Sequence, residues 1–159
     1  MRSKRTLHRR PPCSSASIYA SKVRDGLAPG DIDHILARSQ ANNARVGVTG
    51  ALCYTGGVFL QCLEGGRREV NEVYHRIVGD TRHRDPAILG FTEVTARDFA
   101  DWAMGYVGYT ADNRALFLKY CPRPEFDPYT MSTASVVALL HELLGVARWK
   151  TARTERPSP

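Results

Sequence analysis

The sequence predicts an α+β fold of the ferredoxin-like type, in which a mixed sheet in the order β-α-β-β-α-β-β carries two helices on one face. Three observations support this fold. Apolar residues recur at helical spacing in two separate segments, strand-like segments lie between them, and the glycine pair Gly56-Gly57 joins two of these strands. A split βαβ unit with one added strand gives this order, and a C-terminal pair of helices follows it.

The first strand is expected at residues 15–20. A helix then begins near Asp31, which is a favourable N-cap residue, and its apolar residues follow helical spacing. Asn42 lies seven residues after Ile35, and Asn43 lies seven residues after Leu36. Because seven residues are close to two helical turns, both carboxamides are expected near the inward face at the end of this helix.

The remainder of the chain is expected to contain four further strands and three helices. The predicted strands span 48–54, 58–64, 87–94 and 99–109, and the predicted helices span 68–78, 112–120 and 132–146. In the last strand, alternation would place Trp102, Met104 and Tyr106 on one face. The last two helices are too short to bury their apolar faces alone, so we expect them to pack on the sheet or on a neighbouring subunit.

The domain organisation follows from length and charge. With 159 residues, the chain is expected to form a basic disordered tail at 1–14, the sheet-containing domain at 15–111, the helical pair at 112–147 and a second disordered tail at 148–159. Its net charge of +6 comes from these tails, since the first ten residues carry five cations and the last twelve a net three. A solvated tail accounts for this charge, so we do not expect nucleic-acid binding.

The cysteines and the apolar segments indicate the compartment. No segment approaches the roughly 18 apolar residues that are needed to span a bilayer, and Pro11-Pro12 stands where a signal peptide would have its apolar core. The four cysteines form no CxxC pair and no metal-binding spacing with histidine. We therefore expect a cytoplasmic protein with free thiols, no bound metal and no membrane contact.

Polar residues occur where a small domain should be apolar. Tyr19 lies in the first strand, Asn42 and Asn43 extend an apolar helix face, and Gln61 interrupts an apolar strand. A buried carboxamide without partners costs on the order of 1–3 kcal/mol. Several such groups in one core predict a polar ligand.

Six motifs point to a known family. They are Ile18-Tyr19-Ala20-Ser21, Asn42-Asn43 with Gly47 to Leu52, Gly57 to Gly65, Tyr74-His75-Arg76-Ile77, Asp80-Thr81-Arg82-His83 and Arg97 to Met104. In this order and spacing, over about 95 residues, the sequence resembles the BLUF domains, which are blue-light sensors that use FAD. The resemblance is to the short, single-domain members that carry a C-terminal helical pair.

The resemblance implies a role for each residue of the site. Tyr19 would donate an electron and a proton to the excited flavin, and Gln61, whose amide both donates and accepts, would exchange its hydrogen bonds. Trp102 and Met104, on the last strand, would transmit the change. The residues at FAD-contacting positions are Ile35, Asn42, Asn43, Arg76, Ile77, Arg82 and His83.

The resemblance also implies non-covalent FAD, no catalytic output domain, and a signal that passes to a separate protein partner or through a homo-oligomer. Two alternatives remain on the same fold. One is a light-independent binding or regulatory module, and the other is a small acylphosphatase-like hydrolase with Val23-Arg24-Asp25-Gly26 as its anion loop. No GxGxxG or GxxxxGK[ST] motif is present, so the sequence predicts neither a Rossmann site nor a P-loop.

Overall fold

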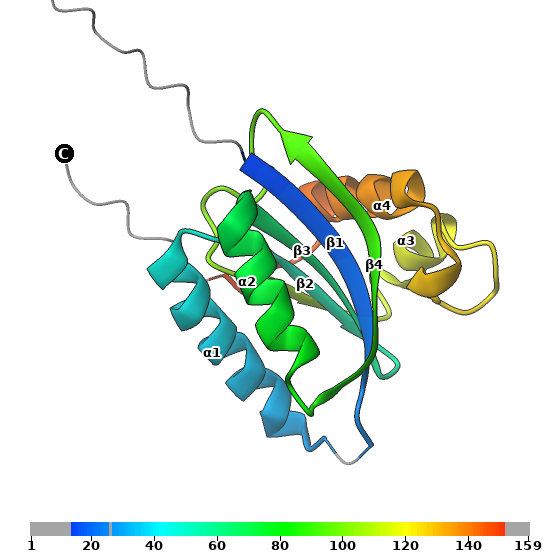
Figure 1. Cartoon of the computed structure of the whole chain (residues 1–159). Helices are drawn as coiled ribbons and strands as arrows, with labels where there is room; N and C mark the ends of the chain where they lie inside the picture. Colours follow the sequence, from blue (N-terminus) through cyan, green and yellow to red (C-terminus); the bar gives the residue numbers. More distant parts are fainter. Residues whose placement is uncertain (1–13, 26, 152–159) are drawn as a thin grey trace, which may run out of the picture.

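In the computed structural model, which describes residues 14–25 and 27–151, five strands form one mixed sheet (Figure 1). The strands are β1 (Ser14–Val23), β2 (Thr49–Thr55), β3 (Val58–Gly66), β4 (His83–Val94) and β5 (Gly105–Gly108). Their spatial order is β4-β1-β3-β2-β5, with β5 parallel to β2 and the other pairs antiparallel. The predicted ferredoxin-like sheet with one added strand is confirmed.

Helices cover both faces of this sheet. The long helices α1 (Pro29–Val46) and α2 (Arg67–Val78) lie on one face, and α3 (Arg114–Lys119), a short 3-10 helix (Pro128–Thr130) and α4 (Thr133–Val146) lie behind the other (Figure 1). The C-terminal helices therefore pack on their own sheet, which was one of the two expected arrangements.

Strand alternation divides the interior into two apolar cores. Tyr19, Leu52 and Leu63 belong to the core beneath α1 and α2, whereas Ile18 and Cys62 belong to the core beneath α4. Because successive side chains of a strand point to opposite faces, each central strand contributes to both cores.

The ends of α1 have different determinants from those predicted. Ala28 is the N-cap, and Asp31 is the third helical residue, so the prediction of Asp31 as the N-cap is wrong. The Asp31 carboxylate instead accepts a hydrogen bond of 2.6 Å from the Ala28 N–H, as the acidic residue of a capping box does. At the other end, Gly47 adopts a φ of 69°, the left-handed conformation that ends many helices.

Two predictions about the strands have opposite outcomes. Gly56 and Gly57 have φ values of 55° and 83°, so they form the tight turn expected between β2 and β3. The strand predicted at 99–109 is wrong in its first half, because only Gly105–Gly108 is extended. Upstream of it, the chain is held in turns, since the Glu64 carboxylate accepts from the N–H groups of Asp98 and Phe99.

The predicted tails lie mostly outside the described residues, which exclude 1–13 and 152–159. At their inner limits the chain is packed: Ser14 begins β1, and Lys150 exchanges two backbone hydrogen bonds of 2.8 Å with Tyr106 of β5. No helix among the described residues has the length and apolarity to cross a bilayer.

Candidate functional site

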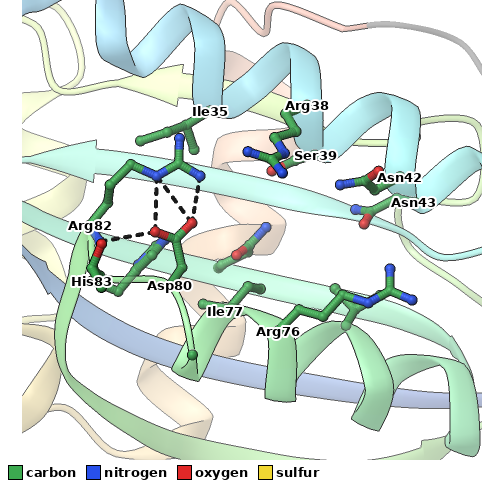
Figure 2. Close-up of a pocket in the computed structure, with 14 residues that line it drawn as sticks. Ile35, Arg38, Ser39, Asn42, Asn43, Arg76, Ile77, Asp80, Arg82 and His83 are labelled. Carbon is green, nitrogen blue, oxygen red and sulfur yellow. Dashed lines mark hydrogen bonds and ion pairs between the residues drawn. The ribbon is translucent and has the colours of Figure 1, made fainter.

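A cavity of about 530 Å³ lies between α1 and α2 above the sheet. Figure 2 shows side chains of α1, such as Arg38 and Asn42, opposite Arg76 and Ile77 of α2. The predicted site residues that line the cavity are Ile35, Asn42, Asn43, Gln61, Arg76, Ile77, Arg82 and His83. The structure thus brings together, around one cavity, side chains from two helices, the central strand β3 and the start of β4.

Gln61 links the cavity to two buried neighbours. Tyr19 and Gln61 are direct register partners on β1 and β3, and the Tyr19 hydroxyl donates a hydrogen bond to Oε1 of Gln61. On its other side, Nε2 of Gln61 donates to the sulfur of Met104 at 3.3 Å. Thioether sulfur is a weak acceptor, so the amide donor of this residue, which is 4% exposed, is only weakly satisfied by the protein.

Tyr19 is a phenol held in its neutral form. It has no exposed surface, and its ring meets the ring of Tyr74 edge to face with centroids 5.3 Å apart. Burial raises the pKa of the Tyr19 hydroxyl well above its ordinary value, and the proximity of Tyr74 raises it further. The protonated form of the phenol is therefore favoured, and its hydroxyl donates to Gln61.

The two asparagines of α1 are not equivalent. Asn43 is 2% exposed, and its Nδ2 donates to the carbonyl of Ala103 at 3.1 Å, which leaves its Oδ1 for a ligand. The Asn42 side chain is half-buried, lines the cavity, and has no hydrogen-bond partner among residues 14–25 and 27–151. One carboxamide thus ties α1 to the sheet, while the other is available to the cavity.

An ion pair closes one end of the cavity (Figure 2). The Asp80 carboxylate accepts from Nε of Arg82 at 3.0 and 3.1 Å and from the Arg82 backbone N–H at 2.9 Å. The hydrogen bond from the Arg82 guanidinium lowers the pKa of Asp80 to about 2. Beside this pair, His83 Nδ1 lies 2.8 Å from the Ser21 hydroxyl, and burial lowers the pKa of His83. Burial therefore favours the neutral form of His83.

Trp102 and Met104 lie on opposite sides of the sheet edge. Met104 is fully buried in the core beneath α1 and α2, whereas Trp102 packs against the rings of Phe99 and Trp149 in the core beneath α4. The expectation that they share one face is therefore wrong, because residues 99–104 do not form the strand on which it rested. Of the two, Met104 contacts Gln61.

Sequence reasoning missed several residues of this region. Arg38, Ser39 and Asp80 also line the cavity, and Gln40 of α1 donates to the Met104 carbonyl at 3.0 Å. Helical spacing could have found two of them, since Arg38 and Ser39 precede Asn42 by about one turn. No sequence pattern indicated the contact of Gln40, because it depends on where the turn before β5 lies.

Residues 15–105 match the family described as "BLUF: Sensors of blue-light using FAD". The chain belongs to the BLUF family. The antirepressor BluF from Escherichia coli, described as blue light- and temperature-regulated, is 32% identical over 87 residues, which are 55% of this chain and 22% of that protein. A second relative, the photoactivated adenylate cyclase subunit beta from Euglena longa, is 29% identical over 87 residues, which are 54% of this chain and only 10% of that protein.

Short BLUF proteins of known structure match almost end to end. BlsA in its photo-activated state is 26% identical, with a TM-score of 0.79 over 87% of this chain and 99% of that chain. BlrB in its dark state is 32% identical, with a TM-score of 0.70 over 84% and 96%. The FAD-dependent blue-light sensing that defines the family is thus the function class of this chain, and its C-terminal helices are part of the matched architecture.

The cavity fits the cofactor of a BLUF protein. Arg38 and Arg76 line it without a hydrogen-bond or ion-pair partner in the described part of the chain, so two cations are available for a diphosphate. Ile35 and Ile77 supply apolar walls on the two helices, the Asn42 carboxamide supplies a donor and an acceptor, and Asn43 supplies its Oδ1 as an acceptor. This combination suits a flat heteroaromatic ring with polar edges and an anionic tail.

Proposed function

We propose that this BLUF protein binds FAD non-covalently between α1 and α2 and signals through the hydrogen bonds of Gln61. The observation that carries the proposal is the position of one amide between a phenol and a thioether: Oε1 accepts from Tyr19, and Nε2 donates to Met104. A primary amide is the side chain that can exchange donor and acceptor by a half-turn.

Tyr19 is the proposed electron and proton donor. Bound FAD supplies the absorption of blue light and, when excited, an acceptor for one electron and one proton. Tyr19 is fully buried, and within the described part of the chain its hydroxyl has one hydrogen-bond partner, Gln61, so its proton would leave along that hydrogen bond. The phenol and the amide therefore act as a unit, and loss of either should stop the response.

Rotation of the Gln61 amide changes what Met104 contacts. In the orientation described here, Nε2 faces the sulfur, which is a favourable contact between a donor and a weak acceptor. After a half-turn, Oε1 would face the sulfur, and two acceptors would be opposed, while Nε2 would face the Tyr19 oxygen. The preferred position of Met104 thus depends on the amide orientation, and a modest shift in population results.

The C-terminal region is the proposed output. From Met104 the chain runs directly into β5, where Tyr106 pairs with Lys150, and the Trp102 ring lies 5.1 Å from that of Trp149. A displacement near Met104 would therefore reach the end of the chain through both the backbone and the aromatic cluster. Asn42, Asn43, Arg76, Arg82 and His83 would hold the cofactor, with Ile35 and Ile77 on either side of its ring.

The signal would pass to a separate protein or through a homo-oligomer, without catalysis by this chain and in the cytoplasm. Two comparisons support a partner: one relative is named an antirepressor, and the short proteins BlsA and BlrB are matched over nearly their whole lengths.

The test is a visible spectrum of the purified full chain, recorded in darkness and under blue light. The wild type should contain FAD and show a reversible shift of its absorption to longer wavelength. Gln61→Leu should retain FAD and lose the shift. Protein that stays colourless after incubation with FAD would contradict the proposal.

A further inference from the structure

Three consecutive carbonyl groups before β5 are held by α1 and β2. The Trp102 carbonyl accepts from the Gly50 N–H at 3.1 Å, the Ala103 carbonyl from Asn43 at 3.1 Å, and the Met104 carbonyl from Gln40 at 3.0 Å. The parallel ladder between β2 and β5 begins only at Gly105. Side-chain amides of α1 therefore satisfy the two carbonyls that the ladder does not reach.

Gln40 and Asn43 form a pair on one face of α1. They lie three residues apart, a spacing that puts side chains next to each other on a helix, and they bind successive carbonyls. Asn43 also lines the cavity, so its substitution would disturb cofactor binding and backbone support together. Gln40 does not line the cavity. It therefore allows the support of this segment to be tested apart from ligand binding.

We propose that Gln40 is a positioning residue for the Gln61 switch, an inference that rests on the proposed function. Its amide holds the Met104 backbone, and the position of that backbone brings the Met104 sulfur to 3.3 Å from Nε2 of Gln61. We assign the described orientation of the Gln61 amide to the dark state, and this contact favours it. Gln40 thus sets how strongly the dark state is preferred, and with it how fast the illuminated protein recovers.

Removing the Gln40 donor should slow recovery and leave light detection intact. In Gln40→Leu the Met104 carbonyl loses its donor, so the segment that carries the sulfur is less well fixed and the dark orientation loses part of its advantage. We expect FAD content and the size of the red shift to match the wild type, and dark recovery to be slower by about tenfold. Gln40→Lys keeps an N–H donor of similar reach, and its recovery should lie close to wild type.

A dark measurement complements the photocycle. Hydrogen exchange of the full, FAD-bound chain should be faster in Gln40→Leu for peptides that cover residues 102–106, and unchanged in β3. Ala41→Leu is the matched control, because it places the same side chain one residue along the same helix on an exposed position. Gln40→Ala, which combines loss of the donor with high helix propensity, replaces Gln40→Leu if that variant does not fold.

The outcomes separate this inference from the proposed function. Recovery within twofold of wild type in Gln40→Leu, or an equal slowing in Ala41→Leu, would overturn the role of Gln40. Failure of Gln40→Lys to restore recovery would do the same, because the effect would then not depend on the donor. A wild type without a red shift would refute the proposed function, and the exchange comparison would still decide whether Gln40 holds residues 102–106.

Discussion

Tyr19 and Gln61 face each other across β1 and β3 as direct register partners, and the phenol of one donates to the amide oxygen of the other. Neither side chain is on a loop or at a sheet edge. The position of the two side chains is therefore fixed by the register of two central strands. Rotation of the Gln61 amide about its terminal bond requires no movement of this backbone.

Tyr19→Phe should separate binding from response. Phenylalanine keeps the ring contact with Tyr74 and removes the donor to Gln61, so FAD should be retained and the light-induced red shift lost. The buried Gln61 oxygen loses its partner, which should lower the free energy of unfolding by about 1 kcal/mol. Difference spectra and chemical denaturation measure these effects. Tyr74→Phe is the control and should keep the shift; a full shift in Tyr19→Phe would exclude Tyr19 as the donor.

Trp149→Ala should weaken the C-terminal contact without affecting the cavity. The Trp149 ring packs on Trp102, and its Nε1 donates to the Leu143 carbonyl at 3.0 Å. Loss of this half-buried ring should lower the free energy of unfolding by about 2 kcal/mol, whereas Trp149→Phe should lower it less. Both variants should show the wild-type red shift. A lost shift would mean that the aromatic cluster contributes to the photoactive site itself.

Asp80→Asn should destabilise the protein in a pH-dependent manner. The pKa of Asp80 is lowered from 3.8 to about 2 by Arg82, so its ion pair stabilises the folded state above pH 3.8 and that contribution is lost as the pH falls towards 2. The pair is partly exposed, so we expect a loss of about 1 kcal/mol at pH 7 that disappears near pH 2. Denaturation at several pH values tests this. Asp85→Asn, in an exposed pair with Lys22, should have little effect.

Glu64 should affect the pH dependence of the unfolding free energy in the opposite direction to Asp80, and Glu64→Gln should remove this effect. Burial raises the pKa of Glu64, although its hydrogen bonds from the N–H groups of Asp98 and Phe99 act to lower it. A raised carboxyl pKa contributes stability below pH 4.5 that is lost as the pH rises through the folded pKa. The wild type should therefore lose unfolding free energy above pH 4.5, and the variant should lack that part of the decline.

Denaturation from pH 4 to pH 8 measures this difference. Glu72→Gln is a suitable control, because that carboxylate lies on the exposed side of α2 in a pair with Arg68. Identical pH profiles for the wild type and Glu64→Gln would show that the Glu64 charge has no net effect on stability.

Much of the fold could be predicted because local and global signals agree. The apolar residues at helical spacing around Ile77 predict the helix α2, and the pair Gly56-Gly57 predicts a tight turn. Each of these local patterns corresponds to a single type of structure. The cavity residues of α1 followed from helical spacing, since Ile35 and Asn42 are about two turns apart and therefore lie on one side of the helix. Their roles toward FAD remain predictions.

The segment before β5 could not be predicted from local pattern. Trp102, Met104 and Tyr106 alternate as strand residues do, but a buried carboxylate on another strand, Glu64, binds the backbone at residues 98–99 and holds the chain in turns. Long-range side-chain contacts of this kind leave no periodicity in the sequence. For the same reason, the support of Met104 by Gln40 is visible only in the structure.

Strand β3 has almost no surface in contact with water, since seven of its nine residues are buried. It presents Gln61 to the cavity between α1 and α2, and the neighbouring Leu60 and Cys62 to the core beneath α4. Few substitutions on β3 should therefore change the absorption of the protein alone. A bulkier residue that displaces β3 on the cavity side also displaces it on the side of α4. Substitutions on β3 that change the absorption spectrum should therefore also change the signal to the C-terminal helices.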